Sequence, residues 1–430
     1  METKKKKIKI KWKTAAPALV CVLLFAYLCI SLLIGLFTSS GKDPDIYKIG
    51  DLTGKKTLEV ISKEDRQNPV LINDYNFYGE SLNLYFDSYS QSIKRSDTLS
   101  GKNIILKDLL NEKNIVEFAN LTSNIDNQIR LENIPEGFYA LYLKDGETLS
   151  RLYYNSVIAY DNVIYTVRRN GISKKIELIA DKSLFDEKEK NENVLDNNYL
   201  YLKVTTATEE ENKQYDIAIS TAPALVYEGV SLEGVEENGL VEAKELYDVA
   251  LELKSLLESK GLKVLVLKDE YNQDISFYGV GGILNSAYSS KAKYMLHLDM
   301  DEYGNKSILY SSKSTGLLAK DIFDQLFKNT SLYPSNEYLS VNDLAEDNLS
   351  DSQFEIREAG GIALSAGTYS ENSQKNYSFA GNNKFGIDTV QIITTNINDY
   401  DDAEIWLKDK SKIAPSIAQG ICDFLKINME

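Results

Sequence analysis

An uncharged stretch of 23 residues, Ala15–Phe37, constrains this chain more than any other feature of its sequence. As a helix it would span about 34 Å, enough to cross the hydrocarbon core of a bilayer. Seven lysines and one glutamate precede it within Met1–Lys13, and such positive charge favours the cytoplasmic side of a membrane. We therefore predict a basic cytoplasmic tail over 1–14, a single-pass transmembrane helix over 15–37, and an extracytoplasmic body after Thr38.

Cleavage of this stretch as a signal peptide is the alternative. The apolar run exceeds the usual signal core of about 7–15 residues, and no clear A-x-A site follows it, so we prefer an uncleaved anchor in the cell membrane. Cys21 and Cys29 lie within the predicted span, which leaves Cys422 without a partner for an intramolecular disulfide. Its apolar surroundings predict a buried residue on the last helix.

Charge and histidine content exclude several classes of function. The formal net charge is -16, and because the first 13 residues contribute +6, the rest of the chain carries -22. Such an acidic body repels phosphate groups, so we expect no binding to nucleic acid. His297 is the single histidine. A site with two histidines is therefore excluded, and any Ser-His-Asp or Cys-His arrangement would have to use His297.

The next part of the chain has the pattern of a β-rich domain. After a polar stalk over 38–50, short runs of β-branched and aromatic residues alternate with turn residues across 51–205. This pattern predicts a β-sandwich, and one short phrase within it, RLENIPEGFYALYLKDG, weakly resembles immunoglobulin-like and transthyretin-like surface modules. Its aromatic side chains are either half-buried residues of a sheet or contacts for a glycan or a protein partner.

From residue 215 onward the pattern predicts an α/β domain that extends to residue 430. Amphipathic segments with helical spacing alternate with continuous apolar runs, which is typical of a mainly parallel sheet covered by helices. The strands are expected at 215–221, 263–270, 294–300 and 389–397, and the helices at 242–259, 282–292, 315–329 and 403–427. Ligands of such sheets bind beyond the carboxyl ends of the strands.

The order of these elements resembles the zinc-dependent N-acetylmuramoyl-L-alanine amidases, a family of peptidoglycan hydrolases. The resemblance implies a first strand that ends in a D-x-G-H-G-G motif with a zinc-binding His, and a ligand Glu at the start of the first long helix. It also implies a third ligand, the His of S-I-H-A-N, and a general-base Glu at the end of a late strand. Three ligands leave zinc an open position for the water that attacks the amide.

Two of these four positions match this chain. Glu242, in NGLVEAKEL, falls on the ligand Glu, and His297, in YMLHLDMDE, falls on the strand-end ligand His. Pro223 stands about where the first His is expected, and Thr394 stands near the general-base position, within a residue or so. The resemblance thus implies a vestigial metal site of Glu242 and His297 without an intact catalytic set.

Two alternatives remain open at this site. A neighbouring carboxylate can replace the lost ligand, because carboxylates also bind zinc. The candidates are Asp299, Asp301, Glu236, Glu237 and Glu245. His297 can instead be an ordinary histidine at a strand end whose hydrogen bonds are satisfied within the protein.

Together these patterns predict a membrane-anchored cell-envelope protein with a catalytically degenerate amidase-like domain. We expect it to bind peptidoglycan, or to act as a scaffold or regulator of envelope enzymes, without a cofactor unless a residual zinc site survives. The alternative is an active zinc-dependent peptidoglycan amidase with an atypical metal site. A third interpretation is a structural adaptor that binds its partner through the β-rich domain.

The predicted topology can be tested with a protease added to intact, wall-stripped cells. Because the lysine cluster places the N-terminus inside, the protease should digest the chain beyond Thr38 and leave the tail protected. Immunoblotting with antibodies against each end distinguishes the two products. Protection of the body until the cells are lysed would contradict this orientation.

Overall fold

The chain divides into two compact units, Met1–Asp51 and Leu52–Glu430. The computed structural model describes residues 61 and 66 and the ranges 68–86, 102–121, 129–155, 163–181, 198–223, 231–277, 280–310, 314–332, 338–340 and 384–429, all in the second unit. The predicted transmembrane helix, 15–37, lies outside the described residues. Within the ranges just given, no helix has both the length and the apolar character that a membrane span needs.

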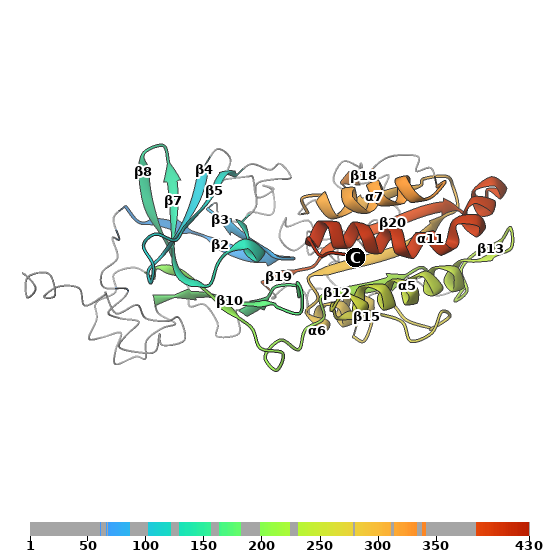
Figure 1. Ribbon diagram of the computed structural model, residues 1–430, viewed down its shortest axis with the longest axis horizontal. Helices are drawn as coiled ribbons and strands as arrows, with labels where there is room; N and C mark the ends of the chain where they lie inside the picture. Colours follow the sequence, from blue (N-terminus) through green and yellow to red (C-terminus); the bar gives the residue numbers. More distant parts are fainter. Residues whose placement is uncertain are drawn as a thin grey trace, which may run out of the picture. The chain divides into compact units, whose positions relative to one another are not determined.

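The β-rich region forms two sheets (Figure 1). The larger has the strand order β1-β8-β7-β11-β10-β9, with β4 also paired to β7 and β5 paired to β4. Its strands are β1 (Val70–Ile72), β4 (Lys102–Asp108), β5 (Ile115–Leu121), β7 (Gly137–Asp145), β8 (Thr148–Tyr154), β9 (Val163–Tyr165), β10 (Lys174–Ala180) and β11 (Leu200–Thr206). The smaller sheet has the order β19-β2-β3-β6. Its strands are β2 (Asp74–Tyr78), β3 (Ser81–Tyr85), β6 (Ile129–Arg130) and β19 (Phe385–Gly386), and the 3-10 helix η2 (Leu131–Asn133) follows β6.

Both sheets contribute side chains to one hydrophobic core. Phe77 and Leu82 of the smaller sheet belong to the same buried cluster as Leu106 and Leu141 of the larger one. The strand character expected from the sequence is therefore present, while an immunoglobulin-like or transthyretin-like topology stays a prediction. One strand comes from far along the chain, because β19 pairs in parallel with β2.

The region after residue 215 is built on a mainly parallel sheet with the order β15-β12-β16-β20-β17-β18. Only the contact of β17 with β20 is antiparallel. The strands are β12 (Ile217–Thr221), β15 (Val264–Val266), β16 (Tyr294–Asp301), β17 (Ser307–Tyr310), β18 (Tyr338–Ser340) and β20 (Asp388–Asn396), and a separate hairpin joins β13 (Glu236–Glu237) to β14 (Leu240–Val241). The expected mainly parallel α/β sheet is thus observed.

Helices cover both faces of this sheet. They are α5 (Glu242–Ser259), α6 (Ile283–Ser290), α7 (Leu317–Asn329) and α11 (Tyr400–Leu425). Figure 1 shows α7, α11 and α5 side by side over the strands, and their apolar residues share one core. A second, smaller cluster lies around α6. Cys422 is fully buried on α11, as its apolar surroundings predicted.

Helix α5 begins and ends where the sequence predicted. Its buried residues Leu246, Val249, Leu253 and Leu257 recur at three- and four-residue spacing and face the main core. The helix ends at Ser259, and Gly261 follows with a φ of +83°, a left-handed conformation that glycine adopts without strain. The apolar stripe therefore fixes both the face and the position of α5, and with them the place of Glu242 at its start.

Replacing Leu253 with alanine tests this packing. Leu253 is fully buried, so the lost contacts and the cavity should lower the free energy of unfolding by about 2–5 kcal/mol. Leu251→Ala is the matched control, since Leu251 lies on the same helix with 43% of its surface exposed and should change stability by less than about 0.5 kcal/mol. Urea denaturation measures both variants. Equal effects would contradict the observed orientation of α5.

Candidate functional site

The candidate site lies toward the carboxyl ends of three neighbouring parallel strands. Ser220 of β12 is paired with His297 of β16, and His297 is paired with Gln391 of β20. All three side chains are buried. Parallel pairing therefore aligns a hydroxyl, an imidazole and an amide across the middle of the sheet.

His297 is enclosed and hydrogen-bonded. Its Nδ1 atom lies 2.7 Å from Oγ of Ser220, and the ring of Phe277 meets its imidazole edge-to-face at 6.3 Å between centroids. Only 1% of the residue is exposed. Burial, together with the nearby positive charge of Lys268, lowers the pKa of His297 to about 3. The imidazole is therefore neutral at physiological pH.

Glu242 occupies the first position of α5, close to the same strand ends. Its Oε2 atom accepts a hydrogen bond of 3.0 Å from the backbone N–H of Val235. The carboxylate packs so closely on Gly234 that a Cβ atom there would lie 2.1 Å from Oε2. Burial and the neighbouring charge of Asp299 raise the pKa of Glu242 to about 8. The glycine thus makes room for the Glu242 carboxyl group.

Lys268 connects these two residues electrostatically. It follows β15, only 3% of it is exposed, and its Nζ atom donates a hydrogen bond of 2.7 Å to the backbone carbonyl of Pro223. Burial lowers the pKa of Lys268 to about 8, while the charge of Glu242 opposes that shift. Because Lys268 also acts on the pKa of His297, its ammonium group interacts with both residues.

The residues present do not fit a zinc site. Pro223 has no side chain that can bind metal, and the positive charge of Lys268, which acts on both Glu242 and His297, would oppose a bound cation. Within the described ranges, no three side chains of the His, Cys, Asp or Glu type are grouped to hold a metal ion. Structural and catalytic zinc sites need at least three protein ligands, so Glu242 and His297 do not form one as they stand.

The carboxylates that were considered as replacement ligands have separate positions. Asp299 interacts with Glu242 and accepts a hydrogen bond of 2.7 Å from Nε2 of Gln391. Glu245 instead pairs with Trp406 and Lys410 of α11. Asp301 accepts hydrogen bonds from the backbone of its own turn, and Glu236 and Glu237 are exposed on β13. Of these five, only Asp299 shows an interaction with Glu242 among the described contacts.

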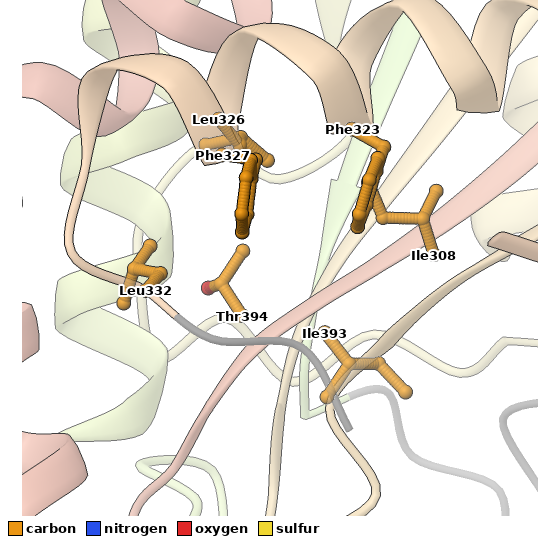
Figure 2. Close-up of a pocket in the computed structure, with 7 residues that line it drawn as sticks. All are labelled: Ile308, Phe323, Leu326, Phe327, Leu332, Ile393 and Thr394. Atoms are coloured by element: carbon orange, nitrogen blue, oxygen red, sulfur yellow. The ribbon is translucent and has the colours of Figure 1, made fainter. Parts of the chain in front are cut away.

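Thr394 lies in a different environment. One extra residue of β20 is accommodated between the pairs Asp299–Ile393 and Asp301–Asn396, and such a bulge re-aims the side chains within it. Figure 2 shows Thr394 beside Phe327 and Leu332 in a pocket that is otherwise apolar. Lys268 thus acts electrostatically on both Glu242 and His297, whereas Thr394 lies in the apolar pocket beside α7.

Sequence reasoning did not assign Lys268, Ser220 or Gln391 to the site. Lys268 and Ser220 stand at strand ends, where ligands of parallel sheets bind. That position in the sequence could have identified them as candidate site residues. Gln391 is a polar residue within the apolar run TVQIITTNI, which marks a buried position with a polar partner. The contact of Lys268 with Pro223 joins residues 45 positions apart and leaves no pattern in the sequence.

Comparisons with known proteins found similar solved structures. No family model matches the chain, and no curated protein does. Solved structures that resemble it include the N-acetylmuramoyl-L-alanine amidase AmiC2 of Nostoc punctiforme, with 12% identity over 49% of this chain and 97% of that one and a TM-score of 0.32. The amidase Ami1 of Mycobacterium abscessus has 14% identity over 49% of this chain and 99% of its own, with a TM-score of 0.31. The catalytic domain of the CD27L endolysin, which targets Clostridia difficile, has 15% identity over 50% of this chain and 100% of its own, with a TM-score of 0.30.

These structural neighbours are amidases, and the similarity covers about half of this chain. Identities and TM-scores this low transfer neither an activity nor a metal nor the role of any residue.

The neutral state of His297 predicts a specific dependence on pH. Its pKa of about 3 in the folded protein lies below the value of about 6.5 in the unfolded chain, so the unfolded state binds more protons between these values. The contribution of neutral His297 to the free energy of unfolding is therefore complete above pH 6.5 and is lost as the pH falls toward 3. Because His297 is the only histidine, NMR of the imidazole follows it directly, and no titration should occur between pH 8 and pH 5. A midpoint near the unfolded value would contradict the burial described above.

Proposed function

We propose that this chain is a single-pass cell-envelope protein whose α/β domain binds peptidoglycan, or an enzyme that acts on it, without cleaving it. The cell membrane holds its N-terminal segment, and the body is extracytoplasmic. The proposal rests on the resemblance of the α/β domain to peptidoglycan amidases together with the chemistry of the candidate site.

The observation that carries the loss of catalysis is the residue near the expected general-base position. It is Thr394, whose hydroxyl cannot take a proton from water near neutral pH and which lies in an otherwise apolar pocket. Amide hydrolysis at a metal requires both a bound metal and a positioned base. Glu242 falls on the ligand position of the resemblance and not on the position of the base.

One observation favours the alternative of an active amidase with an atypical site. Asp299 lies close enough to Glu242 to affect its pKa, and Asp299 is a carboxylate. An active enzyme would have to use it as the third ligand or as the base. The hydrogen bond from Gln391 and the presence of Lys268 count against both roles.

The test uses the purified full-length chain in detergent with isolated cell-wall sacculi. We expect the chain to sediment with the sacculi and to release no peptide with added zinc, because loss of a general base alone slows such reactions by about 10²–10⁴-fold. His297→Ala should sediment as the unchanged chain does. Zinc-dependent release that disappears in both Glu242→Ala and His297→Ala would establish the active enzyme instead.

A further inference from the structure

Three loops beyond the carboxyl ends of the central strands are joined by hydrogen bonds. In the turn between β13 and β14, Nδ2 of Asn238 donates to the carbonyl oxygen of Ile397 at 2.9 Å, in the loop that leads from β20 to α11. In that loop, Nδ2 of Asn398 donates to the carbonyl oxygen of Glu302 at 3.1 Å, in the turn between β16 and β17. β13 and the start of α11 lie at the same end of the α/β region (Figure 1). The three loops therefore form one connected surface.

The turn between β16 and β17 is also fixed from within. Oδ2 of Asp301 accepts hydrogen bonds from the backbone N–H groups of Tyr303 and Asn305, at 2.7 and 2.6 Å. Lys306 forms an ion pair of 2.6 Å with Asp402 and so joins the turn to α11. Because the backbone around Tyr303 is already held in place, a partner that contacts this side chain has less conformational freedom to remove.

Two tyrosines of this surface are exposed to solvent. Tyr303 has 85% of its surface exposed, and Tyr400, the first residue of α11, has 63% exposed. Leu407, which is also exposed, follows Tyr400 by two helical turns on the same face of α11, about 10 Å along the helix. It lines a shallow groove on α11, whose other lining residues are Asp401, Glu404, Ile405 and Lys408. Exposed tyrosines on a fixed backbone are typical of surfaces that bind another protein.

The same surface carries an excess of negative charge. Its exposed carboxylates are Glu236, Glu237, Glu302, Asp399, Asp401 and Glu404. Within the described part of the chain, none of these six forms an ion pair, whereas exposed carboxylates elsewhere do: Glu258 pairs with Lys254, and Asp324 pairs with Lys320. Among the residues that line the groove, only Lys408 is basic. A partner with positive charge would therefore complement this surface.

We infer that the surface formed by Tyr303, Tyr400, the groove on α11 and the six carboxylates binds a segment of a partner protein that is rich in arginine or lysine. The carboxylates attract basic side chains, and the two exposed rings offer faces for cation–π contacts. A polymer that carries many carboxylates or phosphates would be repelled. The inference deepens the proposed function, on which it rests, by assigning the binding of a protein partner to this surface.

Fluorescence anisotropy of a short, fluorescein-labelled peptide of alternating arginine and glycine tests the inference. The full-length chain is used in a nonionic detergent, and the peptide has no apolar side chain that would enter the micelles. The unchanged chain should bind this peptide at low ionic strength and should not bind a peptide of alternating glutamate and glycine. Added salt should weaken the binding, because the Debye length falls to about 3 Å at 1 M.

Two matched pairs of substitutions separate this surface from the general acidity of the chain. Glu302→Gln with Asp401→Asn should weaken binding of the arginine peptide roughly tenfold, because close opposite charges are lost. Glu112→Gln with Glu147→Gln removes the same charge from exposed turns of the β-rich region. This control should change the affinity by less than about twofold, since its charges lie beyond a Debye length from the surface.

The aromatic contribution has its own variant. Tyr303→Ala with Tyr400→Ala should weaken binding roughly fivefold, because both exposed cation–π contacts are lost. Tyr215→Ala is the control, since Tyr215 lies before β12, at the other end of the strands, with 37% of its surface exposed. It should leave the affinity unchanged.

Two results would overturn the inference. The first is equal weakening by the two pairs of charge substitutions, which would show attraction to the acidic chain as a whole. The second is unchanged peptide binding by Tyr303→Ala with Tyr400→Ala, and if this variant also fails to sediment with sacculi, the surface contacts the wall instead. Sedimentation of the unchanged chain with sacculi, without peptide binding that depends on these side chains, contradicts this inference alone. The expected peptide binding together with cleavage of sacculi contradicts the proposed function alone.

Discussion

A single buried carboxylate, Glu80, joins the β-rich region to the α/β sheet. It accepts hydrogen bonds from both terminal nitrogens of Arg169, at 2.8 and 2.7 Å, and from the hydroxyl of Tyr294 at 2.9 Å. Burial alone would raise the pKa of Glu80, but Arg169 and Tyr294 outweigh it and lower that pKa. Next to it, Arg168 forms a buried ion pair with Asp216 at 2.8 Å. Removing one partner of such a pair lowers the free energy of unfolding by roughly 3–5 kcal/mol, because the other charge is left buried without compensation. These contacts therefore hold the first residues of β16 and the approach to β12 against the β-rich region.

The position of this junction determines which edge of the sheet remains for a functional site. Tyr294 is the first residue of β16, and Asp299 lies five residues later, about 16 Å along an extended strand. The amino ends of the central strands are thus held at the junction, and the carboxyl ends lie at the opposite edge. That edge carries His297, Asp299 and the start of α5. The contacts that Glu80 and Arg168 make with Tyr294 and Asp216 therefore lie at the end of the central strands opposite Asp299.

Local patterns predicted the parts of this fold that local physics determines. The bounds of α5, the parallel strands and the burial of Cys422 follow from apolar spacing, which is written in consecutive residues. The pairing of β19 with β2 and the contact of Lys268 with Pro223 were not predicted, because each joins distant residues through the backbone. At the site, the roles of Glu242 and His297 stay predictions, and the structure places them at the start of α5 and in β16. Thr394 was harder to place, since a bulge in β20 changes the direction of side chains and has no signature in the sequence.

The burial of Lys268 and His297 limits how the domain can contact a partner. Lys268 and His297 expose 3% and 1% of their surfaces, so a polymer such as peptidoglycan cannot reach them without local opening. For the proposed binding of a wall or a protein, the contacts would come from side chains around these buried residues. A substitution such as His297→Ala acts on stability before it acts on affinity. The acidic character of the body also favours a partner that is not strongly anionic, because like charges slow association and weaken it at low ionic strength. The proposed function therefore requires binding through surface side chains, with Lys268 and His297 left buried.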